Sequence, residues 1–163
     1  MKYLLLLAFS VILLSCRKEG IRKTEKDNEK KVSITTGVWG TVSCREGNCM
    51  PGVGPSKCKE NPVQRTVRIY AYTLLSQATV SQGDSRFYDA FSTPLIKETE
   101  ADSQGFFQAE LAPGQYTLTV IENGKLYANQ FEGTPSNLAI QPFTVSNGSV
   151  LKKNILIDYK AAY

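Results

Sequence analysis

Short runs of alternating apolar and polar residues fill the chain from Val32 onward. Val67 and Ile69, for example, flank Arg68, and such a period of two is typical of strands with one buried and one solvated face. No segment of this part keeps an apolar period of 3.6 over three turns, so we expect little helix. The pattern predicts eight strands, at residues 34–43, 66–74, 95–102, 105–111, 114–122, 126–131, 140–145 and 150–159.

Turn residues separate these runs. Asn123-Gly124 is the strongest short hairpin signal, and Asn147-Gly148 repeats it before the last run. Asp-Ser-Gln-Gly at 102–105 predicts another hairpin in which Gly105 takes a positive φ, and Ala-Pro-Gly at 112–114 turns the next pair. Short strands with turns this frequent predict an all-β fold, an antiparallel β-sandwich of seven to eight strands.

The first residues follow a different pattern. After a short positive start at Lys2, residues 4–14 form an apolar run broken only by Ser10. A run of eleven residues suits a signal peptide, whereas a helix that crosses the bilayer hydrocarbon needs about 20. Leu-Leu-Ser-Cys at 13–16 then resembles the lipobox of bacterial lipoproteins. The resemblance implies that a leader, 1–15, is removed and that Cys16 carries acyl chains that hold the protein at a membrane.

The net charge of +4 is concentrated just after Cys16. Residues 17–31 hold seven Lys or Arg against four acidic residues, whereas the chain from Val32 onward holds eleven of each. The neutral part argues against a nucleic-acid-binding face, which needs clustered cations. Because 17–31 contains no aliphatic residue except Ile21 and no aromatic one, we expect 16–31 to be a flexible charged tether. Its cations are either solvated or in contact with anionic headgroups.

The remaining residues, 32–163, are enough for one β-sandwich domain that buries about two-thirds of its unfolded surface. The sequence contains no histidine, which is the usual general base near neutral pH and the commonest metal ligand. Asp84, Asp89 and Asp102 lack the spacing of a calcium loop. We therefore expect no catalytic residue, no metal site and no cofactor, and a protein that is not an enzyme.

Four segments carry a second resemblance. They read GVWGTV at 37–42, VRIY at 67–70, TEADSQGFF at 99–107 and LAPGQYTLTV at 111–120. These are similar to the G-x-V, T-x-x-D-G-x-F and L-x-P-G-x-Y-x-L-x-V patterns of the carboxypeptidase regulatory-like family, although Asp102 and Gly105 are separated by two residues here. The resemblance implies a transthyretin-like β-sandwich without catalytic residues, often found on lipoproteins and outer-membrane proteins of Bacteroidetes-type bacteria. It implies a lipid-anchored protein of the cell envelope, in the outer membrane, on either its periplasmic or its surface face.

Three cysteines remain once Cys16 is acylated. An odd number in an oxidising compartment predicts one disulfide and one leftover thiol. Segment 46–52 followed by Cys58 resembles a loop of Bacteroidetes-type lipoproteins in which the two cysteines are the constant pair. That resemblance implies a Cys49–Cys58 disulfide, with Cys44–Cys58 as the main alternative.

Residues 76–94 form a long predicted loop that carries Phe87, Tyr88 and Phe91. Exposed aromatic rings in such a loop can stack on sugars or contact a partner protein, while the alternative is that they cover the open end of the core. Two functions follow. The first is a structural or interaction module that contacts membrane lipid and an envelope protein, and the second is a glycan- or small-ligand-binding module using this loop. An enzyme ranks third.

Overall fold

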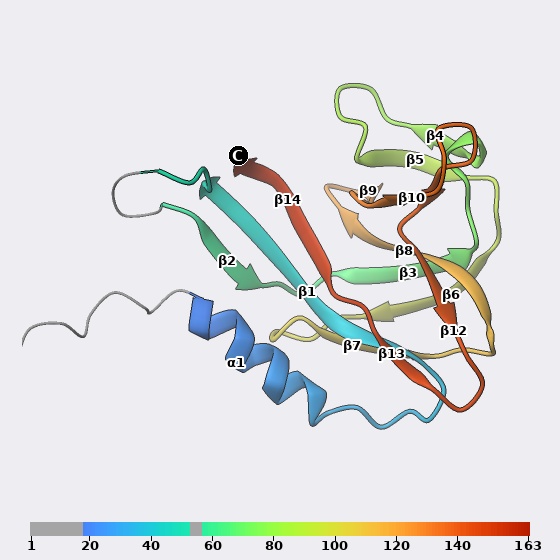
Figure 1. The fold of residues 1–163 in the computed structure, drawn as a ribbon, viewed down its shortest axis with the longest axis horizontal. Helices are drawn as coiled ribbons and strands as arrows, with labels where there is room; N and C mark the ends of the chain where they lie inside the picture. The colour runs from blue at the N-terminus through green and yellow to red at the C-terminus, as the bar shows by residue number, and fades with distance from the viewer. Residues whose placement is uncertain (1–17, 53–56) are drawn as a thin grey trace, which may run out of the picture.

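The computed structural model describes residues 18–52 and 57–163. Two β-sheets pack face to face around a shared core, and a single α-helix in this part of the chain lies against one of them (Figure 1). The protein is therefore the all-β sandwich that the sequence predicts. No helix in the described part is long and apolar enough to cross a membrane. The leader 1–15 and Cys16 lie outside the described residues.

The first sheet is built around one long strand, β1 (Gly37–Asn48). Its first half pairs with β7 and β13, and its second half pairs with β2 and β14. The pairs with β13 and β14 are parallel, so this sheet is mixed rather than purely antiparallel, because the chain returns to it from the other sheet instead of through a hairpin. The partners of β1 are β2 (Lys59–Pro62), β7 (Phe106–Glu110), β13 (Val150–Lys152) and β14 (Ile155–Ala162).

The second sheet has seven strands and is antiparallel throughout, in the order β4-β5-β9-β8-β3-β6 with β12 also paired to β8. A 3₁₀ turn, η1 (Leu75–Gln77), precedes β4, and β10 (Phe131–Glu132) pairs with β11 (Ala139–Ile140) beside the sheet. The strands are β3 (Thr66–Ala71), β4 (Ala78–Val80), β5 (Phe87–Phe91), β6 (Leu95–Glu100), β8 (Gly114–Glu122), β9 (Lys125–Tyr127) and β12 (Pro142–Val145).

Every predicted strand overlaps an observed one, and the turn chemistry is confirmed. Asn123 and Gly124 have φ values of 54° and 74°, and Gly105 has a φ of 70°. Three differences stand out. Strand β1 runs five residues past the predicted end at residue 43, the run 150–159 is broken into β13 and β14, and the predicted loop 76–94 contains β4 and β5.

The core lies between the two sheets. Apolar side chains of β1, β7 and β14 meet those of β3 and β8, and the cluster includes Val42, Phe107, Ile157, Ile69 and Leu118, all at most 1% exposed. A second, smaller cluster contains Tyr70, Tyr88, Leu126, Ala128 and Ile140. The second sheet therefore buries side chains on both of its faces.

The stretch expected to be a flexible tether is instead largely helical. Helix α1 (Lys18–Glu29) packs on the first sheet, with Ile21 partly buried and Asn28 fully buried. The Asn28 amide donates to the Thr41 hydroxyl (2.9 Å) and to the Gln104 carbonyl (3.0 Å). The expectation of a tether without regular structure was wrong because it weighed apolar burial alone, while this helix docks largely through hydrogen bonds.

Candidate functional site

The aromatic residues of 76–94 are part of the core rather than an exposed loop. Phe87 is 8% exposed and packs edge-on against Tyr127 and Tyr159, with ring centroids 5.1 Å apart in both pairs. Tyr88 is fully buried, and burial raises its pKa to about 12. Phe91 contacts the rings of both Tyr70 and Tyr88. Their predicted role as exposed ligand contacts was therefore wrong for Phe87 and Tyr88, and Phe91 is half-buried between rings.

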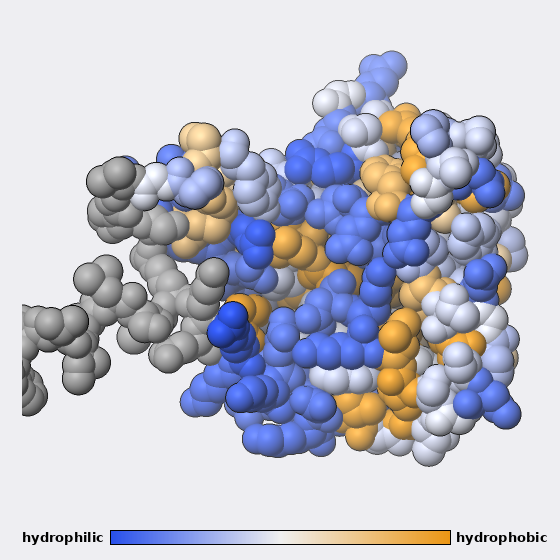
Figure 2. All heavy atoms as spheres, in the orientation of Figure 1, coloured by the Kyte–Doolittle hydropathy of each residue, from blue (hydrophilic) through white to orange (hydrophobic). Residues whose placement is uncertain are grey.

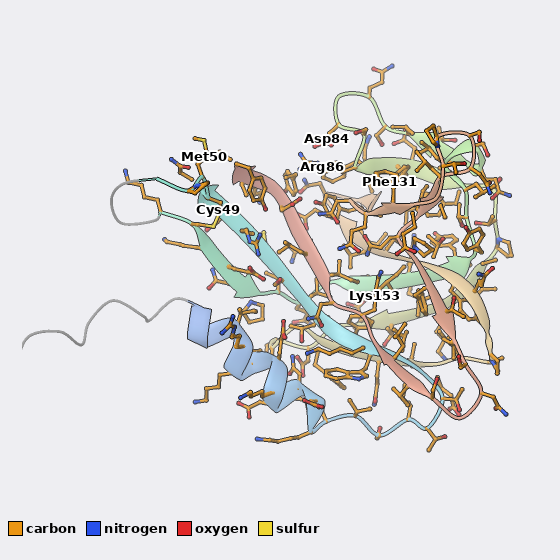
Figure 3. The ribbon with its side chains drawn as sticks, in the orientation of Figure 1. Cys49, Met50, Asp84, Arg86, Phe131 and Lys153 are labelled. Carbon is orange, nitrogen blue, oxygen red and sulfur yellow. A yellow bond between two sulfur atoms is a disulfide. The ribbon has the colours of Figure 1, made fainter. Side chains whose placement is uncertain are left out.

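The disulfide joins Cys49 and Cys58, as the lipoprotein resemblance implies, so the alternative Cys44–Cys58 pairing was wrong. It closes the tip of the hairpin of β1 and β2, which extends away from the body (Figure 3). Among the cysteines of the described residues, Cys44 is the free thiol, and it is partly buried in β1. Burial raises the pKa of this thiol, so Cys44 has the character of a packing residue rather than of a nucleophile.

A carboxylate at the junction of the sheets has its hydrogen-bonding capacity taken up. Asp158 of β14 accepts from the Tyr127 hydroxyl (2.8 Å), the Asn129 amide (3.0 Å) and the Tyr163 hydroxyl (3.2 Å), and Arg86 lies 3.4 Å away. Burial raises the pKa of Asp158, but the hydrogen bonds from these donors lower it by a larger amount, so the pKa stays below its usual value. A carboxylate held ionised and fully engaged ties β14 to the second sheet and is poorly suited to proton transfer.

A groove of about 470 Å³ lies where the edges of the two sheets meet, between β12 and the stretch around β13. The register of the second sheet places Thr144 of β12 directly opposite Gln115 of β8, and Tyr72 follows the end of β3 in the same row. Glu132 of β10 and Lys153, labelled in Figure 3, complete its polar lining. The apolar part of the lining is Pro142, Phe143 and Leu151.

The groove presents polar groups beside an exposed ring. The Lys153 ammonium donates to the Pro142 carbonyl (3.3 Å) and lies 3.9 Å from the Glu132 carboxylate. Within the described part of the chain, the side chains of Gln115 and Thr144 make no hydrogen bond. Tyr72 is 36% exposed. Donors and acceptors beside apolar walls, in a volume of this size, suit a small polar ligand with an apolar face.

Sequence reasoning missed this groove because its residues come from five separate segments and meet only through strand register. No group of three or more His, Cys, Asp or Glu residues suited to a metal ion occurs in the described residues. Comparisons with protein-family models, with curated proteins and with solved structures found no match for this chain. The roles of the candidate sites are therefore inferred from the chemistry of their residues alone.

Proposed function

We propose that this protein is a lipid-anchored, non-enzymatic module of the bacterial cell envelope, held at the outer membrane by acyl chains on Cys16. The observation that carries the proposal is the order of segments at its N-terminal end. An apolar run too short to span a bilayer ends at a lipobox-like cysteine, and α1 begins two residues later. The anchor point is thus joined to the folded body by a docked helix.

The carboxypeptidase regulatory-like resemblance supports the same proposal. In its L-x-P-G-x-Y segment, the Tyr116 ring packs against the main core and its hydroxyl donates to the Ala112 carbonyl (2.8 Å). The residues of this motif therefore fix a turn and a core ring rather than a catalytic group. A domain of this kind acts by binding another molecule, as a structural or interaction module that contacts an envelope protein.

Labelling with fatty acid tests the anchor. When the full chain is expressed in a bacterial host fed radiolabelled palmitate, we expect the wild-type protein to be labelled and to lose its first 15 residues. Cys16→Ser should lose the label almost entirely and keep the leader, whereas the control Cys44→Ser should be labelled like wild type because Cys44 is a partly buried thiol of the body. A mature protein whose mass lacks acyl chains would contradict the proposal.

A second candidate function is glycan binding, now in the groove of Tyr72, Gln115, Glu132, Thr144 and Lys153 instead of the 76–94 segment. The exposed Tyr72 ring lies beside the side chains of Gln115 and Thr144, which make no hydrogen bond in the described part of the chain. This favours glycan binding, since a sugar offers an apolar ring face and a rim of hydroxyls.

Titration of the protein with cellobiose and with diacetylchitobiose tests this second function. We expect weak binding, with a Kd on the order of 1 mM, and a loss of tenfold or more in Tyr72→Ala. Phe131→Ala is the matched control because Phe131 is 39% exposed and lies outside the groove lining. Equal affinity of the two variants, or no binding of either sugar, would exclude this role.

A further inference from the structure

The outer side of α1 is basic. Arg22, Lys23 and Lys26 are exposed and form no ion pair within the described part of the chain, and Lys30 follows the helix end with Asp27 at 2.9 Å. At 3.6 residues per turn, positions 23, 26 and 30 share one side of the helix. Figure 2 shows hydrophilic residues over this part of the surface. Four exposed cations against the carboxylates of Asp27 and Glu29 leave this side net positive.

The inner side of α1 is fixed to the body. Glu25 accepts from the Asn154 amide (2.8 Å) and pairs with Lys152 (3.1 Å), while the buried amide of Asn28 is bonded to the first sheet. Just past the helix, Lys31 pairs with Asp102 at 2.7 Å. Because these contacts set the rotation of the helix about its axis, the cations of the outer side are held pointing away from the body.

The position of α1 in the chain decides what these cations face. The helix starts two residues after Cys16, and its 12 residues extend about 18 Å at 1.5 Å per residue. With acyl chains at Cys16, the first turn of the helix lies near the headgroup layer, and the outer side reaches this layer along its length when the helix lies parallel to the membrane. The attraction between clustered cations and anionic lipid acts within about a Debye length, roughly 8 Å at physiological salt.

We propose that the outer side of α1, with Arg22, Lys23, Lys26 and Lys30, lies on anionic lipid headgroups, and that the β-sandwich is consequently held side-on against the membrane. This inference rests on the proposed acylation of Cys16. In this arrangement α1 fixes the orientation of the body, whereas a flexible spacer would let the body move freely. The second sheet then lies on the far side of the first sheet from the lipid.

Lysine footprinting on the acylated full-length protein tests the orientation. The protein is reconstituted into vesicles of phosphatidylcholine, with or without phosphatidylglycerol, and its amines are acetylated and followed by peptide mass spectrometry. We expect Lys23 and Lys26 to react at least about threefold more slowly when phosphatidylglycerol is present, and this protection to disappear at high salt. Lys97 of β6, exposed and without an ion pair in the described part, should react equally in both vesicles.

A variant pair separates charge from position. In Lys23→Gln combined with Lys26→Gln, the lipid-dependent protection of Lys30 should fall, while Lys97→Gln should leave it unchanged. The intact mass is measured first, so that missing acyl chains are recognised as a failure of the anchoring proposal itself. With acyl chains present, equal rates for Lys23 and Lys26 in the two kinds of vesicle would overturn the side-on orientation.

Discussion

Replacing Arg65 by Leu is expected to lower the free energy of unfolding by about 3 kcal/mol or more, because it leaves a buried carboxylate without its partner. The Arg65 guanidinium donates to Glu122 at 2.6 Å, and the Glu122 side chain is only 3% exposed. The remaining donor is the Tyr159 hydroxyl (2.8 Å). Urea unfolding followed by the fluorescence of Trp39, the single tryptophan and a buried one, measures the change.

Arg68→Leu is the matched control. Arg68 pairs with Glu98 at the same distance of 2.6 Å, but the two side chains are 36% and 45% exposed. Exposed pairs of this kind contribute between about 0 and 1 kcal/mol, so this variant should unfold close to wild type. Equal losses from Arg65→Leu and Arg68→Leu would mean that burial of Glu122 does not determine the effect.

The pH dependence of the same variant identifies the group responsible. Burial raises the pKa of Glu122, but hydrogen bonds from Arg65 and Tyr159 lower it by a larger amount. Its pKa in the folded protein therefore lies below the ordinary 4.5. A lowered pKa contributes stability that is present above about pH 4.5 and is lost as the pH falls through the folded-state pKa. The difference between wild type and Arg65→Leu should therefore be largest near pH 7 and shrink as Glu122 becomes protonated in both.

The strands that the sequence predicted best are those in which apolar and polar residues alternate, even where both faces are buried, as Thr117 and Thr119 are in β8. In β3 and β8, Ile69 and Leu118 point into the main core while their neighbours do not, so the chain alternates visibly. Strand β5 was missed for the opposite reason. Phe87 belongs to the core between the sheets and Tyr88 to the second cluster, so consecutive side chains are buried on opposite faces and no alternation results.

Polar docking is the other feature that the sequence pattern did not reveal. Strand β2 has no large apolar side chain and is held by backbone pairing with β1, where Arg45 also binds Glu60 (2.7 Å). Helix α1 likewise docks through Glu25 and Asn28, which look like ordinary solvated residues in sequence. Hydrophobic periodicity reports the burial of apolar surface, whereas such contacts depend on partners that only the fold brings near. The groove around Tyr72 was missed for the same reason.

Gly40 shows how the break between β13 and β14 constrains β1. At this break the Lys153 amide donates to the Trp39 carbonyl (2.8 Å), and the Asn154 side chain accepts from the Thr41 amide (3.0 Å). The returning chain therefore lies directly against β1 at the residue between these two bonds. A Cβ atom at Gly40 would overlap the Lys153 carbonyl oxygen, and backbone atoms cannot turn aside as a flexible side chain would.

Gly40→Ala is accordingly expected to lower the free energy of unfolding by about 3 kcal/mol, at the upper end of the range for overpacked cores. Gly20→Ala makes the same chemical change in α1, where a Cβ would meet nothing within 4 Å, and should leave stability unchanged or raise it by up to about 1 kcal/mol. Urea unfolding of both variants gives the comparison. The two variants thus separate the general effect of replacing glycine by alanine on stability from the effect of the close approach of Lys153. An unchanged unfolding midpoint for Gly40→Ala would contradict the parallel return of the chain against β1.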